Sequence, residues 1–227
     1  MGLDKKSYRG TRDFFPEDFS IREYLFSHMH NTAQQFGYLG YDGPLLEPVE
    51  LYQAKSGEEL INDQIYSFTD RGDRFVAIRP EMTPTLARMV AQVYREYPKP
   101  LRWYAIPNLM RYEKPQKGRL REHWQFNCDI FGAPENLGER EIIELAVSLL
   151  QSFGANDSHF ALLLNDRRIV DGLIQKSLDV DSQTSLKIYK IIDRAKKISA
   201  KDLENDLLKI LSEEKTNIIL EYLALSD

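Results

Sequence analysis

The sequence is poor in the residues that form cross-links and metal sites. It has one cysteine, Cys128, in 227 residues, so it cannot form an internal disulfide. Its four histidines are scattered along the chain without a cysteine nearby, which argues against a structural zinc site. We therefore expect no structural metal, and any metal ion that takes part in the chemistry would arrive with a substrate.

Long hydrophobic runs are missing as well. The longest, such as residues 160–164, fall far short of the roughly 20 residues that a membrane-spanning helix needs. No apolar segment follows Met1, and we expect a cytoplasmic protein without membrane contact. The net charge of −5 argues against a protein that coats nucleic acid through overall charge, but it leaves room for a local basic patch.

Glycine and proline are absent from residues 173–227. Short amphipathic runs at 185–197 and 202–211 predict helices there, because neither helix-breaking residue interrupts them. The whole chain is 42% hydrophobic and 29% charged, which is typical of a globular protein with a core. We expect a main domain over residues 1–168 and a small all-helical appendage over residues 169–227.

The main domain alternates helical and extended patterns. Apolar residues recur every three or four positions from Ile21 to Phe36, which predicts a helix that ends at Gly37. Residues 38–51 read as extended, because glycines and prolines interrupt any helical pattern. Further signals predict a strand pair within 63–78, helices over 84–97 and about 139–153, and a strand at 160–164.

A long hairpin is predicted near the middle of the chain. Residues 101–113 and 122–131 read as antiparallel strands joined by the polar loop 114–120. In the second strand apolar and polar residues alternate, which places the two sets on opposite faces. The apolar set faces the core and the polar set forms a candidate ligand floor: Trp124, Phe126, Cys128 and Ile130 against Gln125, Asn127 and Asp129.

An arginine and a glutamate two positions apart end the first of these strands. Arg111 and Glu113 therefore lie on one face. The basic loop residues that follow are Lys114, Lys117, Arg119 and Arg121. Arginine matches a phosphate through charge-assisted, often bidentate hydrogen bonds. The plain alternative is a solvated loop with a surface ion pair worth ~0 to 1 kcal/mol.

Amide and acidic groups near this strand end can complete a small polar site. If Gln125 and Asp129 share a face with Arg111, they would enclose a ligand that carries an amino group or an imidazole N–H. Ordinary outward alternation of a half-buried sheet explains both residues equally. Upstream, Thr83 is either a helix N-cap or a ligand contact, and Glu81 either complements the helix dipole or binds an ammonium group.

Five segments occur in an order and at a spacing that are specific in combination. They are Gly10-Thr-Arg-Asp-Phe, Gly43-Pro44 after Phe36-Gly-Tyr, Arg79-Pro-Glu-Met-Thr83, the run from Arg111 to Arg119, and the run from Gln125 to Gly132. Together they resemble the N-terminal part of the histidyl-tRNA synthetase family, over residues 8–168. The resemblance implies an α+β class II synthetase core, with a mainly antiparallel mixed sheet flanked by helices. It also implies a homodimer with Pro44 at its interface, and an appendage similar to the start of an insertion domain that touches the tRNA acceptor arm.

The same resemblance implies the roles of the site residues. Arg111 would be the catalytic residue, in contact with the ATP α-phosphate and the histidine carboxylate. The histidine side would comprise Glu81, Met82, Thr83, Arg111, Gln125 and Asp129. The ATP side would comprise Arg111, Glu113, Arg119, Arg121 and His123. At His123 many family members have a phenylalanine that stacks on adenine, and an imidazole can also stack.

The implied activity is that of a histidine-tRNA ligase, with histidine, ATP and histidine tRNA as partners and Mg²⁺ carried by ATP. The sequence lacks the family's glycine-rich motif 3, with its second ATP-binding arginine, and the anticodon-binding domain. We therefore expect a truncated chain that cannot sustain turnover, since losing one such cationic contact costs ~10² to 10³ in rate.

Two other readings stay open. One is a non-catalytic histidine-binding paralogue, similar to the regulatory subunit of ATP phosphoribosyltransferase. A pure sensor has no use for phosphate-directed arginines, and it would bind histidine without nucleotide synergy. The other is a fragment that dimerises and binds nothing tightly.

Overall fold

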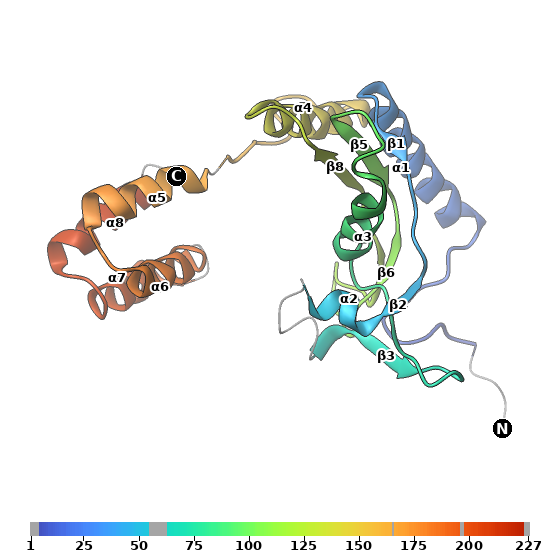
Figure 1. Cartoon of the computed structure of the whole chain (residues 1–227), viewed down its shortest axis with the longest axis horizontal. Coiled ribbons are helices and arrows are strands. Elements are labelled where there is room, and N and C mark those ends of the chain that lie inside the picture. Colours follow the sequence, from blue (N-terminus) through green and yellow to red (C-terminus); the bar gives the residue numbers. More distant parts are fainter. Residues whose placement is uncertain (1–4, 55–62, 165, 196–197, 225–227) are drawn as a thin grey trace. The chain divides into compact units, whose positions relative to one another are not determined.

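The chain divides into two compact units, Met1–Phe160 and Ala161–Asp227 (Figure 1). The computed structural model describes residues 5–54, 63–164, 166–195 and 198–224. Arg168, where the sequence analysis ended the main domain, lies inside α5 (Arg167–Leu173) of the second unit. No helix within these described ranges is both long and apolar enough to cross a bilayer.

The first unit is built on small, mainly antiparallel sheets. The strands described are β1 (Leu39–Gly40), β2 (Leu46–Pro48), β3 (Tyr66–Thr69), β4 (Phe75–Ile78), β5 (Leu101–Ala105), β6 (Asn108–Met110), β7 (Glu122–Trp124) and β8 (Asn127–Phe131). Their orders are β1-β5-β8, β2-β4-β3 and β6-β7. Only the β1 and β5 pair is parallel among the described strands. The mixed, mainly antiparallel sheet with flanking helices is therefore confirmed.

One long hairpin links two of these sheets, as the sequence predicted. Ala105 of β5 pairs with Asn127 of β8, and Asn108 of β6 pairs with Trp124 of β7, so both strand pairs share one register. The break between them lies at Pro107, which has no N–H to give to the ladder.

Hydrogen bonds carry the ladder across this break and beyond β6. The Pro107 carbonyl accepts the Gln125 N–H at 3.3 Å. Past the end of β6, the Arg111 N–H donates to the Arg121 carbonyl at 2.8 Å. The hairpin therefore keeps one alternation of faces along its whole length.

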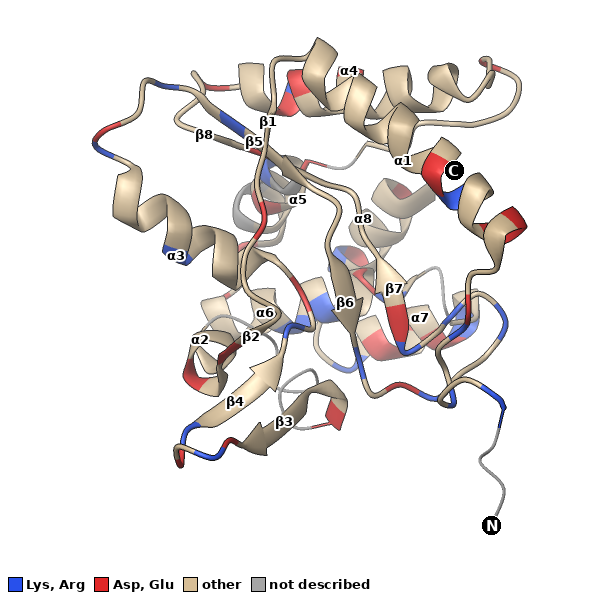
Figure 2. Ribbon diagram, turned by 90° about the vertical axis from the view of Figure 1, so that its right-hand side faces the viewer, with Lys and Arg blue, Asp and Glu red and all other residues tan. Residues whose placement is uncertain are grey.

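Helices cover both faces of the hairpin (Figure 2). On one face Tyr104, Phe126 and Cys128 pack with residues of α1 (Pro16–Gln35) and α4 (Leu137–Ser152). On the other, Leu101 and Trp103 pack against α3 (Thr83–Val93). The predicted alternation of Phe126 and Cys128 with Asn127 and Asp129 is thus confirmed.

The apolar residues predicted to line the inner face of α1 are not all buried. The helix ends near Gly37, at φ +76°, as predicted. However, Ile21 and Tyr24 are 60% and 55% exposed. Arg22 takes the inward position instead, because its guanidinium carbon lies 4.9 Å from the Trp124 ring centroid in a cluster of aromatic rings.

Two further local predictions were wrong. Of the two alternatives for Thr83, the N-cap is wrong, because Thr83 is the first residue of α3 and the N-cap position belongs to Met82 without a side-chain cap. Residues 160–164 form no strand, and Leu163 is 77% exposed. None of the described strands pairs with this apolar run, and a strand needs such a partner for its backbone groups.

The second unit is all-helical, as predicted. Its described elements are α5, the π-helical turn η2 (Ile174–Leu178), α6 (Ser182–Ile192), α7 (Ala200–Leu208) and α8 (Glu213–Ala224). The helices that begin at Ser182 and Ala200 are capped by the Asp181 carboxylate and the Ser199 hydroxyl. The end of the predicted 185–197 run lies outside the described residues.

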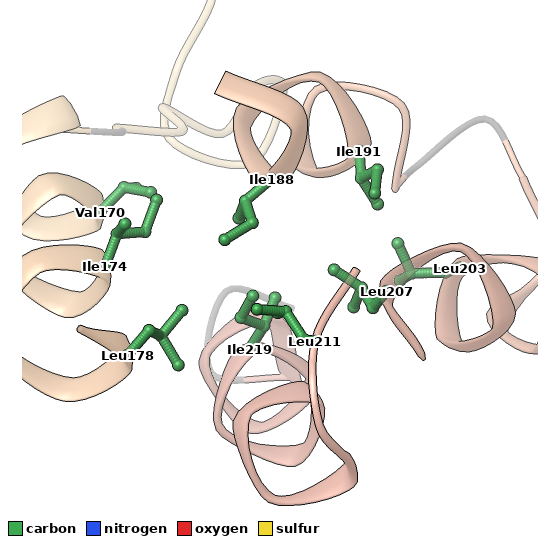
Figure 3. Close-up of a cluster of buried hydrophobic side chains, with 9 residues drawn as sticks. All are labelled: Val170, Ile174, Leu178, Ile188, Ile191, Leu203, Leu207, Leu211 and Ile219. Carbon is green, nitrogen blue, oxygen red and sulfur yellow. The ribbon is translucent and has the colours of Figure 1, made fainter. Parts of the chain in front are cut away.

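The core of this second unit consists of aliphatic side chains from all of these helices (Figure 3). The buried members are Val170, Ile174, Leu178, Ile188, Ile191, Leu203, Leu207, Leu211 and Ile219. Burial of such side chains is the main stabilising contribution that a small helical unit can make.

Leu207 and Leu208 provide a matched test of this core. Leu207 is 0% exposed and Leu208 is 43% exposed. Leu207→Ala is expected to lower the free energy of unfolding by about 2 to 5 kcal/mol, because it leaves a cavity. Leu208→Ala should cost less than about 1 kcal/mol. Urea unfolding followed by far-UV circular dichroism measures both, and equal losses would contradict the packing.

Candidate functional site

The candidate site residues share one face of the hairpin. Because the register is continuous, side chains at odd-numbered positions of both strands project to the same side. The polar residues on this face are Arg111, Arg121, His123, Gln125, Asn127 and Asp129. The register therefore places the candidate amide and acid on the face that carries Arg111.

Arg111 also joins the hairpin to the segment that precedes α3. Its Nε donates to the Pro80 carbonyl at 2.9 Å, and the Met110 N–H donates to the Arg79 carbonyl at 3.2 Å. These bonds hold the end of the strand beside Glu81. The structure thus brings together two of the sequence motifs, which lie far apart along the chain.

Arg79 is the buried anchor of this segment. Its side chain is 7% exposed, and its Nη1 donates to Asp42 Oδ1 at 2.6 Å and to the Gly43 carbonyl at 2.8 Å. Its Nε donates to the Asn108 carbonyl at 3.0 Å. Sequence reasoning gave Arg79 no role, although an arginine directly before a proline and a glutamate was visible there.

Three residues at or just before the start of α3 were expected to contact a histidine ligand, and their exposure differs. Glu81 is half-buried and Thr83 is exposed. Met82 is 1% exposed and packs in the core, where a Cβ added to Gly43 would lie 3.2 Å from its Cε atom. Glu81 and Thr83 are therefore more accessible to a ligand than Met82.

His123 has a half-buried imidazole with a lowered pKa. Burial lowers the pKa of its imidazole, the positive charge of Arg111 lowers the pKa further, and Glu113 opposes the shift. Leu109 pairs with His123, so the His123 ring lies on the same hairpin face as Arg111. A half-buried aromatic ring beside an arginine is suited to stacking on a flat ligand.

Asp129 is a half-buried acid, and burial raises the pKa of its carboxyl group. Its negative charge in turn contributes, after burial, to the raised pKa of Tyr41. The Tyr41 hydroxyl is buried without a hydrogen-bond partner in the described part of the chain. Sequence reasoning missed Tyr41, which lies next to β1 and is held by an N–H bond to the Tyr104 carbonyl at 3.0 Å.

The loop between β6 and β7 borders an open groove of about 950 Å³. Its lining residues are Arg9, Asp63, Gln64, Tyr112, Glu113, Lys114, Pro115, Gln116, Arg119 and Arg121. Glu113 and Arg119 form an ion pair inside it. Figure 2 shows Lys and Arg positions gathered along this loop. Three residues expected on the ATP side, Glu113, Arg119 and Arg121, thus line one groove.

Two remaining expectations concern the dimer and metals. Pro44 is exposed in the segment between β1 and β2. The described residues contain no group of three or more His, Cys, Asp or Glu side chains arranged to hold a metal ion.

Comparisons with known proteins agree with the sequence motifs. The profile described as histidyl-tRNA synthetase matches residues 10–226. A histidine–tRNA ligase of Leptospira biflexa is 50% identical over 197 residues, which are 87% of this chain and 45% of that protein. A chloroplastic/mitochondrial histidine–tRNA ligase of Arabidopsis thaliana is 38% identical over 223 residues, which are 98% of this chain and 46% of that protein.

Solved structures share the fold. A histidyl-tRNA synthetase from a Nostoc species superimposes with a TM-score of 0.83 at 20% identity, over 97% of this chain and 49% of that one. A Bacillus halodurans protein titled ATP phosphoribosyltransferase regulatory subunit/histidyl-tRNA synthetase gives 0.80 at 19% identity, over 96% and 55%. The class II synthetase fold is confirmed. The chain spans about half the length of the curated relatives it matches. Its motifs, its profile match and its similarity to these relatives show that it belongs to the histidyl-tRNA synthetase family.

Proposed function

We propose that this chain carries the histidine-binding and ATP-binding face of a histidine-tRNA ligase. The observation that supports the proposal most strongly is the shared hairpin face of Arg111, His123, Gln125 and Asp129. This face carries an arginine that can bind a phosphate or a carboxylate, a flat aromatic ring, and an amide and an acid that can accept hydrogen bonds from N–H groups.

Histidine would lie along the floor of this face. Asp129 and Gln125 accept hydrogen bonds from its imidazole or ammonium N–H groups. Thr83 at the start of α3 and Glu81 just before it border the same site. Arg111 lies toward the end of the hairpin, where its guanidinium bonds the histidine carboxylate. Met82 packs in the core behind Glu81 and Thr83 and supports this part of the site.

ATP would lie toward the loop. The His123 ring stacks on adenine, Glu113 and Arg119 contact the nucleotide, and Arg121 lines the same groove at the base of the loop. Mg²⁺ would enter with the ATP phosphates as part of the substrate. This fits the donor set, because the described residues offer single carboxylates such as Glu113 but no metal-binding cluster.

The reaction then depends on positioning. The histidine carboxylate oxygen attacks the α-phosphorus, and the bond to the leaving pyrophosphate breaks. The terminal ribose hydroxyl of histidine tRNA later attacks the carbonyl carbon of the adenylate, loses its proton, and displaces AMP as the bond between the carbonyl carbon and the phosphate oxygen breaks. Arg111 orients the first pair of reactants and neutralises the charge that develops between them. Further parts of this proposal are a homodimer with Pro44 in its interface and contact of residues 169–227 with the tRNA acceptor arm.

Histidine titrations with and without ATP·Mg²⁺ test the proposal. Because Arg111 bonds both ligands, the wild-type chain should bind histidine more tightly in the presence of the nucleotide, and Arg111→Ala should abolish this synergy. Isothermal titration calorimetry measures both affinities. Loss of the hydrogen bonds of Arg111 should weaken binding by about 10-fold to 100-fold.

Arg140→Ala is the matched control, because Arg140 forms an exposed ion pair with Glu144 on α4, on the far side of the hairpin. It should leave both affinities unchanged. Histidine binding without any nucleotide effect in the wild-type chain would support a regulatory histidine sensor instead. Binding of neither ligand would refute the proposal.

Asp129→Asn separates binding from stability. The raised pKa means that the ionised carboxylate opposes folding, a cost that is present above the folded-state pKa and fades as the pH falls toward the ordinary value of an aspartate. The variant should therefore be more stable than the wild type near pH 7, and this gain in stability should shrink in acid.

The Asp129→Asn variant should also bind histidine about 10-fold to 100-fold more weakly. Thermal unfolding from pH 7 to pH 4, with calorimetry at pH 7, measures both, and a destabilised variant at pH 7 would contradict this account.

A further inference from the structure

A short segment near the start of the chain holds the base of the loop between β6 and β7. Residues 8–11, here called the N-terminal clamp, form a tight turn in which the Thr11 N–H and Oγ1 donate to the Tyr8 carbonyl at 2.9 and 2.8 Å. The Gly10 carbonyl accepts the Arg121 N–H at 2.7 Å and the Glu122 N–H at 3.3 Å. The clamp is thereby attached to the first residues of the returning strand.

The Arg121 side chain joins the clamp to the loop. Arg121 is 8% exposed, and its Nε donates to the Glu113 carbonyl at 3.1 Å. Its Nη1 donates to the Tyr8 hydroxyl at 3.1 Å. The guanidinium carbon lies 4.1 Å from the Tyr112 ring centroid. The buried guanidinium of Arg121, at the end of the loop, thus connects the clamp with Tyr112 and Glu113 at the start of the loop.

Gly10 allows this close packing. It has φ +88°, and an added Cβ would lie 2.7 Å from Arg121 Cγ and 3.0 Å from Pro115 Cγ. A side chain at this position would therefore push the loop away. Gly154, in contrast, has φ +85° and no atom within 4 Å of its added Cβ. The two glycines share a backbone conformation and differ in whether the loop rests on them.

We propose that Arg121 is a positioning residue, which uses the clamp to fix Glu113 and Arg119 and thereby sets the affinity of the site for ATP. This inference rests on the proposed function, because it takes Glu113 and Arg119 as the nucleotide side. Arg121 acts through these two residues, because its Nε and Nη1 groups already donate to the Glu113 carbonyl and the Tyr8 hydroxyl. The start of the chain then controls nucleotide binding without touching the nucleotide.

Gly10→Ala and Gly154→Ala test whether the clamp holds the loop. Both introduce alanine at a positive φ, so both carry similar backbone strain. Limited trypsin digestion of the full chain without ligands should cut after Lys117 and Arg119 about 10-fold faster in Gly10→Ala, because the loop opens more often. Gly154→Ala should be cut at these sites at the wild-type rate. Equal rates in the two variants would overturn the clamp.

Tyr8→Phe tests the effect on the nucleotide with a milder change. It removes the hydroxyl that accepts from Arg121 and keeps the ring. The Kd for ATP·Mg²⁺ should rise about 3-fold to 10-fold, as expected for one lost hydrogen bond, while the Kd for histidine stays unchanged. A merely structural role would weaken both ligands alike, and that result, or an unchanged Kd for ATP, would overturn the inference.

The two experiments also separate this inference from the proposed function. A wild-type chain that binds neither ligand refutes the proposed function and the nucleotide part of the inference together. The trypsin comparison needs no ligand, so it still decides whether the clamp positions the loop.

Discussion

The continuous register of the hairpin is the constraint on which the candidate site depends. Strand side chains alternate with a period of two, so a slip by one residue would turn Arg111 and Asp129 to opposite faces. The ladder passes Pro107 because its carbonyl still accepts the Gln125 N–H, and it reaches Arg111 through a bond to the Arg121 carbonyl. The packing of Tyr104, Phe126 and Cys128 on one face and the polar site on the other follow from this register.

Two buried arginines stabilise the surroundings of this face through backbone carbonyls. Arg79 bonds the carbonyls of Gly43 and Asn108 and thereby fixes the segment before α3. Arg121 bonds the carbonyl of Glu113 and the hydroxyl of Tyr8. A planar guanidinium with several fixed donors suits such junctions, since it satisfies buried oxygens from separate segments at once.

Much of the fold could be predicted from local pattern. Alternation predicted the hairpin, the absence of glycine and proline predicted the helical second unit, and Gly37 marked the end of α1. The errors arose where tertiary contacts override local signals. Arg22 displaced the apolar stripe of α1 because aromatic rings surround it, and the run 160–164 stayed irregular because no described strand pairs with it.

The site residues came from motifs, and the structure adds how they are held. Spacing could predict that Gln125 and Asp129 share a face, but whether Arg111 shares it depends on a register across Pro107 that periodicity alone does not fix. The anchoring role of Arg79 and the buried hydroxyl of Tyr41 arise from contacts between distant segments, which a single sequence does not reveal.

A crystal structure of the full chain with bound histidine tests the central claim most directly. Our account predicts that the amino acid lies on the hairpin face between the Arg111 guanidinium and the Asp129 carboxylate. Histidine on the opposite face, beside Cys128, or at a site that touches neither of these charged groups would contradict it.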